Sequence, residues 1–178
     1  KESYRWIDSL IKTNEVNNLI EETILVNVGD RESDIYEYFH EAQKLNQSVL
    51  VRAHYNRKIK DSNSKMIDYI SEKDSTGILE LEIPKTKNRK ERIAKLSVKF
   101  AEVELIPPKN KYNKNELNNI KVNVIIAKEI EEVEADTAIN WILLTNIKIN
   151  NFQEACEKLN WYSIRWQIET FHKILKSG

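Results

Sequence analysis

The sequence predicts an α/β fold with a β-rich insertion, on the basis of three observations. Residues 23–53 have the pattern of a strand, a helix and a second strand. Residues 54–140 contain β-leaning runs separated by polar linkers, without a sustained helical period. Residues 151–176 have the spacing of one long helix. Because a strand–helix–strand unit implies parallel strands, we expect a mostly parallel sheet in the first part of the chain.

The strand–helix–strand unit opens with a β-branched run. Residues 24–28 (Ile-Leu-Val-Asn-Val) are closed by Gly29 and Asp30, as expected for a buried strand that enters a turn. Apolar residues at three- and four-residue spacing then predict a helix over 35–46. The run 48–53 (Ser-Val-Leu-Val-Arg-Ala) predicts the second buried strand.

The remaining elements follow from shorter patterns. A weak apolar spacing around Trp6 predicts a short helix near the start of the chain. Further strands are expected at 78–83, 93–106, 121–129 and 141–146. Basic clusters occupy the linkers between these runs, and their simplest interpretation is solvated hairpin loops.

The final helix carries two stripes at helical spacing. The apolar stripe is expected to pack on the sheet and contains Trp161, Ile164, Ile168, Phe171 and Leu175. The second stripe is polar and aromatic and contains Tyr162, Arg165, Trp166, Glu169, Lys173 and Lys176. By periodicity alone, the charges of the second stripe form an ordinary salt-bridge ladder on an exposed helix face.

Composition excludes several classes of protein. The 178 residues carry 28 basic and 28 acidic side chains, so a uniformly basic nucleic-acid-binding surface is excluded and any DNA contact would use a local basic patch. Three scattered glycines exclude the glycine-rich loops of dinucleotide and P-loop sites. A single cysteine excludes an internal disulfide and indicates a reducing compartment, and the three histidines lack zinc-site spacing. No apolar run has the length of a membrane span.

Asp30 has two interpretations. It lies at the carboxyl end of a predicted buried strand, where α/β sheets place binding and catalytic groups. It is also a favourable N-cap for the helix that follows, because its carboxylate can accept orphan backbone amides. Glu32 and Asp34 are expected to be first-turn acids near the positive end of the helix dipole.

Together these segments carry a family resemblance. Residues 28–35 (Val-Gly-Asp-Arg-Glu-Ser-Asp-Ile), 49–53 and 141–145 precede the pattern Tyr162-x-x-Arg165-x-x-x-Glu169-x6-Lys176. In this order they resemble the catalytic domain of bacterial cut-and-paste DDE transposases. More narrowly, they resemble the insertion-sequence family with the Tyr-Arg-Glu-Lys signature, and the start of the chain (Lys-Glu-Ser-x-x-Trp) fits the same family.

The resemblance implies a ribonuclease H-like core interrupted by the β-rich insertion. Residues 1–56 would form part of the core with the second catalytic Asp, residues 57–150 the insertion, and residues 151–178 the core helix with the catalytic Glu. Asp30 and Glu169 match these two metal-binding carboxylates, expected to hold two Mg²⁺ or Mn²⁺ ions together with a third carboxylate. Such ions favour carboxylate oxygens and can activate an attacking water or 3′-hydroxyl.

The resemblance also implies DNA contacts. Residues expected to lie against transposon-end DNA are Arg52, Trp141, Tyr162, Arg165, Trp166, Lys173 and Lys176. The two tryptophans match positions associated with a flipped base and the hairpin end. On chemistry alone, both would more often be core residues.

One departure from the family pattern affects the expected activity. The family's first Asp lies on an earlier strand, and Asp8 has the wrong sequence context to replace it. We therefore expect a partial catalytic domain that is inactive by itself, with an open edge at the strand 24–28. The whole protein is expected to be cytoplasmic, to bind transposon-end and target DNA, and to pair as a homodimer in the synaptic complex. The alternatives are a non-catalytic DNA-binding or assembly module and a ribonuclease H-like nuclease.

Overall fold

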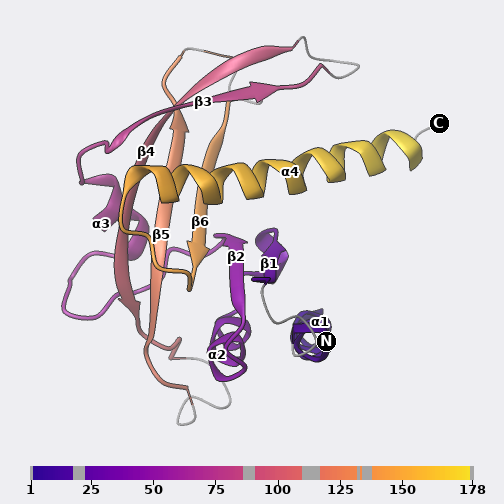
Figure 1. Ribbon diagram of the computed structural model, residues 1–178. Helices are drawn as coiled ribbons and strands as arrows, with labels where there is room; N and C mark the ends of the chain where they lie inside the picture. The colour runs from indigo at the N-terminus through magenta and orange to yellow at the C-terminus, as the bar shows by residue number, and fades with distance from the viewer. Residues whose placement is uncertain are drawn as a thin grey trace.

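A computed structural model describes residues 2–17, 23–85, 91–109, 117–131, 133 and 138–176. The chain forms a mixed α/β structure around one curled sheet (Figure 1). The strands are β1 (Val26–Gly29), β2 (Ser48–Arg52), β3 (Gly77–Ile83), β4 (Arg92–Leu105), β5 (Ile120–Glu129) and β6 (Asn140–Thr145). The helices are α1 (Glu2–Asn17), the 3₁₀-helix η1 (Arg31–Ser33), α2 (Tyr36–Lys44), α3 (Met66–Ser71) and α4 (Phe152–Lys176).

The sheet has the strand order β1-β2-β6-β5-β4-β3 among the described residues. β1 and β2 run parallel with Gly29 opposite Val51, which confirms the predicted strand–helix–strand unit. The other four described pairings are antiparallel, so the parallel arrangement is limited to this unit. The strands expected in the β-rich insertion continue the same sheet, because β6 pairs directly with β2.

Helices cover the two faces of the sheet. α1, α2 and α3 contribute to one buried cluster, and α4 contributes to the other (Figure 1). Side chains alternate between the two faces of a strand, so Val49 and Val51 of β2 join the first cluster and Leu50 joins the second. Both faces of β2 are therefore buried, as its unbroken apolar run predicts.

β4 contributes to both clusters along its length. Ala94, Leu96 and Val98 pack on the side of α4, whereas Val103 and Leu105 pack on the side of α2 and α3. Side chains of a strand point alternately to its two faces. The even positions 94–98 therefore face one cluster, and the odd positions 103–105 face the other.

The packing of α4 corrects the sheet-facing stripe that we expected. Ala155, Leu159 and Tyr162 are buried against the sheet, while Ile164 and Ile168 are 55% and 51% exposed. The reason is which side of the helix meets the sheet. At 3.6 residues per turn, Ile164 and Ile168 lie on the side of α4 opposite Ala155 and Leu159. Periodicity locates an apolar stripe but does not say which face of the helix packs on the sheet. Phe171 and Leu175, also in the predicted stripe, have side chains outside those described.

Two local differences from the expected elements have simple causes. The helix expected over 35–46 is preceded by η1 and begins at Tyr36. α3 was not expected, because its six residues are too few to establish a helical period. Within the described part of the chain, no helix is both long and apolar enough to cross a membrane.

Candidate functional site

Asp30 follows the last residue of β1 at the carboxyl edge of the parallel strand pair. Its carboxylate Oδ1 accepts a hydrogen bond from the Glu32 backbone N–H at 2.9 Å, so Asp30 is the N-cap of η1. Its side chain is 31% exposed. Both interpretations of Asp30 are thus compatible, because the cap engages one oxygen and leaves the carboxylate accessible.

Arg165 reaches the same place from α4. Its guanidinium Nη2 lies 3.5 Å from Asp30 Oδ2, and its Nε donates to the Val28 carbonyl oxygen at 3.3 Å. These two residues are 135 positions apart in the chain, so the contact depends on α4 crossing the sheet beside the end of β1. The arginine ties the helix to the strand that carries Asp30.

Arg52 lies at the end of the neighbouring strand β2. It stands opposite Leu143 of β6, which packs on the side of α4, so Arg52 is on the same face of the sheet. Its Nη2 donates to the Asn140 carbonyl oxygen at 3.2 Å. Asp30, Arg52 and Arg165 therefore all lie at the carboxyl edge of β1 and β2.

Trp141 and Tyr162 occupy the core beneath α4. They are 3% and 2% exposed, and their rings meet edge to face with centroids 5.2 Å apart. This packing anchors α4 on β6, and it is the core interpretation that chemistry alone favoured for Trp141. In this conformation neither ring lies on the surface where DNA would contact it.

The remaining predicted site residues lie on the second half of α4. Glu169, Trp166, Lys173 and Lys176 belong to this helix, but their side chains are outside those described. Glu169 follows Arg165 by four residues, so the helix backbone places both positions on one face.

Asp34 is the feature that sequence reasoning missed. It precedes α2, so it is not a first-turn acid, and its side chain is fully buried. Its carboxylate Oδ1 lies 2.6 Å from Arg57 Nη1, a buried ion pair between the turn after β1 and the loop after β2. The only signal in the sequence was a second Asp four residues after Asp30.

A hollow of about 700 Å³ opens beside this ion pair. Its lining includes Tyr55, Lys58, Pro107, Pro108 and Lys109, and does not include Asp30 or Arg165. The carboxyl edge of the sheet therefore has two distinct regions, one at Asp30 and one at Asp34.

Asp30 has the properties of a ligand for a hard divalent ion. It offers carboxylate oxygens, it is accessible, and the bond from Glu32 sets its orientation. Among the residues that the structure describes, no three His, Cys, Asp or Glu side chains cluster together.

A comparison with known protein families identifies the class. The sequence family described as "Transposase DDE domain" matches residues 9–178. The chain therefore belongs to the DDE transposase family, whose members act on DNA in transposition and recombination and generally use divalent metal ions such as Mg²⁺.

Proposed function

We propose that this chain carries the catalytic region of a transposase of the Tyr-Arg-Glu-Lys group, which cleaves and joins DNA at the ends of an insertion sequence. The observation that carries the proposal is the contact between Asp30 and Arg165 at the carboxyl edge of β1. It brings the Gly-Asp-Arg-Glu-Ser-Asp segment and the Tyr-Arg-Glu-Lys helix, far apart in the sequence, to one place.

The proposed metal ligands are Asp30 and Glu169. A bound pair of Mg²⁺ or Mn²⁺ ions would activate the attacking water or 3′-hydroxyl and stabilise the leaving oxygen. Arg165 holds α4 beside β1, and the four-residue spacing then places Glu169 on the face of α4 that meets Asp30.

We further propose that the sheet continues beyond β1 in a ribonuclease H-like arrangement. Among the described residues β1 pairs with β2 alone, and the second half of α4 projects past it (Figure 1). An additional strand on this edge would lie beneath the projecting half of α4 and could bring the family's first Asp beside Asp30.

The proposed DNA contacts divide by location. Arg165 contacts Asp30, and Arg52 ends the neighbouring strand β2; both would hold the phosphates next to the cleaved bond. Lys173, Lys176 and Trp166 extend this role along the projecting half of α4. For Trp141 and Tyr162, a DNA contact would require the packing between their rings to open. We also propose that the protein forms a homodimer that holds two transposon ends and target DNA.

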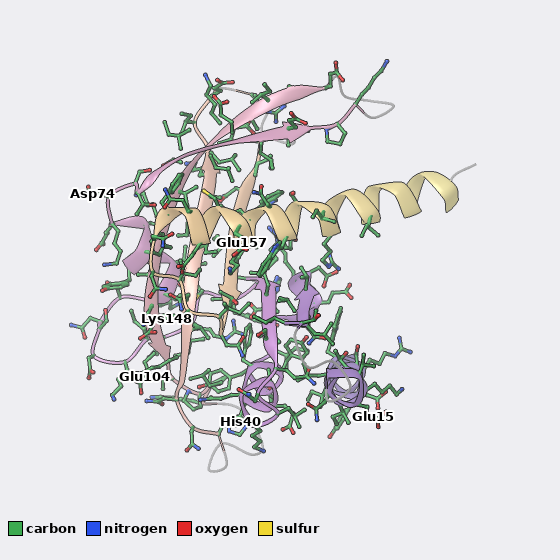
Figure 2. All side chains as sticks on the ribbon, in the orientation of Figure 1. Glu15, His40, Asp74, Glu104, Lys148 and Glu157 are labelled. Carbon is green, nitrogen blue, oxygen red and sulfur yellow. The ribbon has the colours of Figure 1, made fainter. Side chains whose placement is uncertain are left out.

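The first test is calorimetric Mn²⁺ binding by the chain, by Asp30→Ala and by Glu169→Ala. We expect saturable binding that either substitution abolishes. The matched control is Glu157→Ala, which removes an exposed carboxylate from the same helix (Figure 2). Equal binding by all four proteins would contradict the proposed ligands.

The second test concerns the reaction in the transposase that contains this domain. Asp30→Ala or Glu169→Ala should abolish strand cleavage and leave transposon-end binding largely intact. Unaltered cleavage would contradict the proposal. A pre-cut 3′-hydroxyl end should be joined to target DNA, and cleavage without any joining would instead indicate a ribonuclease H-like nuclease.

A further inference from the structure

The turn that carries Asp30 ends in a second aspartate with a different environment. The Asp34 side chain is fully buried and the Arg57 side chain is 8% exposed. Burying two charges is costly, and apolar replacement of a buried ion pair is often neutral or stabilising. The presence of this pair is therefore better explained by the geometry that it imposes than by added stability.

Asp34 holds the loop after β2 through several contacts. Its Oδ2 accepts the His54 and Tyr55 backbone N–H groups at 2.6 and 2.9 Å. Arg57 contacts its Oδ1 and also donates from Nη2 to the Asp34 carbonyl oxygen at 2.9 Å. One residue thus fixes both backbone and side-chain groups of the neighbouring loop.

The loop after β2 is itself anchored to α3. The Met66 backbone N–H donates to the Arg57 carbonyl oxygen at 2.8 Å, and the Ile67 N–H donates to Asn56 Oδ1 at 2.8 Å. Met66 is fully buried in the core. Asp34 is therefore joined to a firmly packed part of the molecule.

The turn between Asp34 and Asp30 is compact. Ser33 Oγ donates to the Asp30 carbonyl oxygen at 2.7 Å, and the Ile35 N–H donates to the Ser33 carbonyl oxygen at 2.8 Å. A Cβ at Gly29 would lie 2.0 Å from Ser33 Oγ, so only glycine fits there. A turn packed this closely transmits the position of Asp34 to Asp30.

We propose that the Asp34–Arg57 ion pair is a positioning device that fixes the turn after β1 to the loop after β2 and so sets the orientation of the Asp30 carboxylate. Its functional consequence rests on the proposed role of Asp30 in metal binding. Arg57 and Asp34 act through Asp30, not on the metal or on DNA.

The experiment measures backbone order in the variants Asp34→Asn, Arg57→Ala and Arg57→Lys. ¹⁵N relaxation gives order parameters for residues 30–33 and for the strands β4 and β5. We expect lower order at 30–33 in Arg57→Ala and Asp34→Asn with little change in the strands, and partial rescue in Arg57→Lys, which keeps the charge. The matched control is Asp68→Asn, which alters an exposed acid that contacts the same loop through Asn56.

Two results would overturn the proposal. Unchanged order at 30–33, with loosening confined to residues 54–57, would show that the two segments are independent. Loss of order throughout the sheet in Arg57→Lys would show that the pair is a general stabiliser.

Mn²⁺ affinity supplies a separate measurement. Outer contacts that orient a ligand typically contribute 10–100-fold to metal affinity, so Arg57→Ala should weaken Mn²⁺ binding about tenfold. If Asp30→Ala leaves Mn²⁺ binding unchanged, the proposed function fails, and the order parameters alone decide whether the pair positions the turn.

Discussion

The carboxyl edge of the parallel strand pair holds two aspartate–arginine pairs with opposite properties. Asp30 and Arg165 lie 3.5 Å apart, and their side chains are 31% and 19% exposed. Asp34 and Arg57 lie 2.6 Å apart, and their side chains are 0% and 8% exposed. The three residues between the two acids thus separate an accessible carboxylate from a fully buried one.

The difference shows how one short turn can provide both chemistry and rigidity. An accessible carboxylate with a loose arginine partner can exchange that partner for a metal ion, and the released arginine can then bind a DNA phosphate. A buried carboxylate with three contacts cannot, because breaking any of them leaves a buried charge unsatisfied. Identical residue types therefore differ in accessibility and in partners, which supports the different roles that we propose for them.

The largest expected effect comes from breaking the buried pair. Asp34→Ala leaves the Arg57 guanidinium buried without its carboxylate, which typically costs about 3–5 kcal/mol. Urea unfolding measures the change in the free energy of unfolding. The control Asp68→Ala removes an exposed acid and should stay within about 0.5 kcal/mol of the parent chain. A similar small change in Asp34→Ala would contradict the distinction between the two pairs.

High pH should lower the free energy of unfolding, because two tyrosines of α2 are buried. Burial raises the pKa of Tyr38 in α2 to about 12. Burial also raises the pKa of Tyr36, a shift that Arg57 opposes and Glu104 (Figure 2) reinforces. A raised folded-state pKa means that stability is fully present below pH 10 and declines as the pH rises from 10 through 12.

The contribution of Tyr38 can be isolated. A shift of this size corresponds to about 2–3 kcal/mol. Urea unfolding at neutral pH and near the raised pKa should show that Tyr38→Phe loses less stability than the parent chain by about this amount. An equal loss in both proteins would mean that Tyr38 titrates normally in the folded state.

The smallest expected effect concerns the exposed pair. A double-mutant cycle with Asp30→Asn and Arg165→Gln should give a coupling energy below about 1 kcal/mol that decreases in high salt. The corresponding cycle at Asp34 and Arg57 should give a larger coupling that salt hardly changes. Equal salt dependence in the two cycles would remove the contrast between them.

Most secondary structure could be predicted because local patterns determine it. The strands β1, β2 and β6 and the helix α4 follow from apolar runs and helical spacing. The two-sided burial of β2 also follows from its continuous apolar composition. The parallel pairing of β1 and β2 was also expected. The other strand pairings, and the continuation of the sheet into the expected insertion, depend on contacts between distant segments and were not predictable.

The candidate site was predictable to a similar extent. The position of Asp30 at a strand end was expected, and Arg165 was among the expected site residues. The burial of Asp34 was not expected, because its partner Arg57 is 23 residues away and belongs to another loop. The exposed face of α4 was misjudged because apolar spacing does not say which side of the helix meets the sheet, and Ile164 and Ile168 lie opposite the side that buries Leu159.

The sequence by itself determined the local elements of this protein, its membership of the DDE transposase family and the residues that could carry chemistry. Only the tertiary structure decided that Arg165 meets Asp30, that Tyr162 packs on Trp141, and that Asp34 is buried with Arg57. The physical reason is the distance along the chain over which each interaction acts. Backbone periodicity and turn preferences act between neighbouring residues, whereas burial and ion pairing depend on segments that only folding brings together.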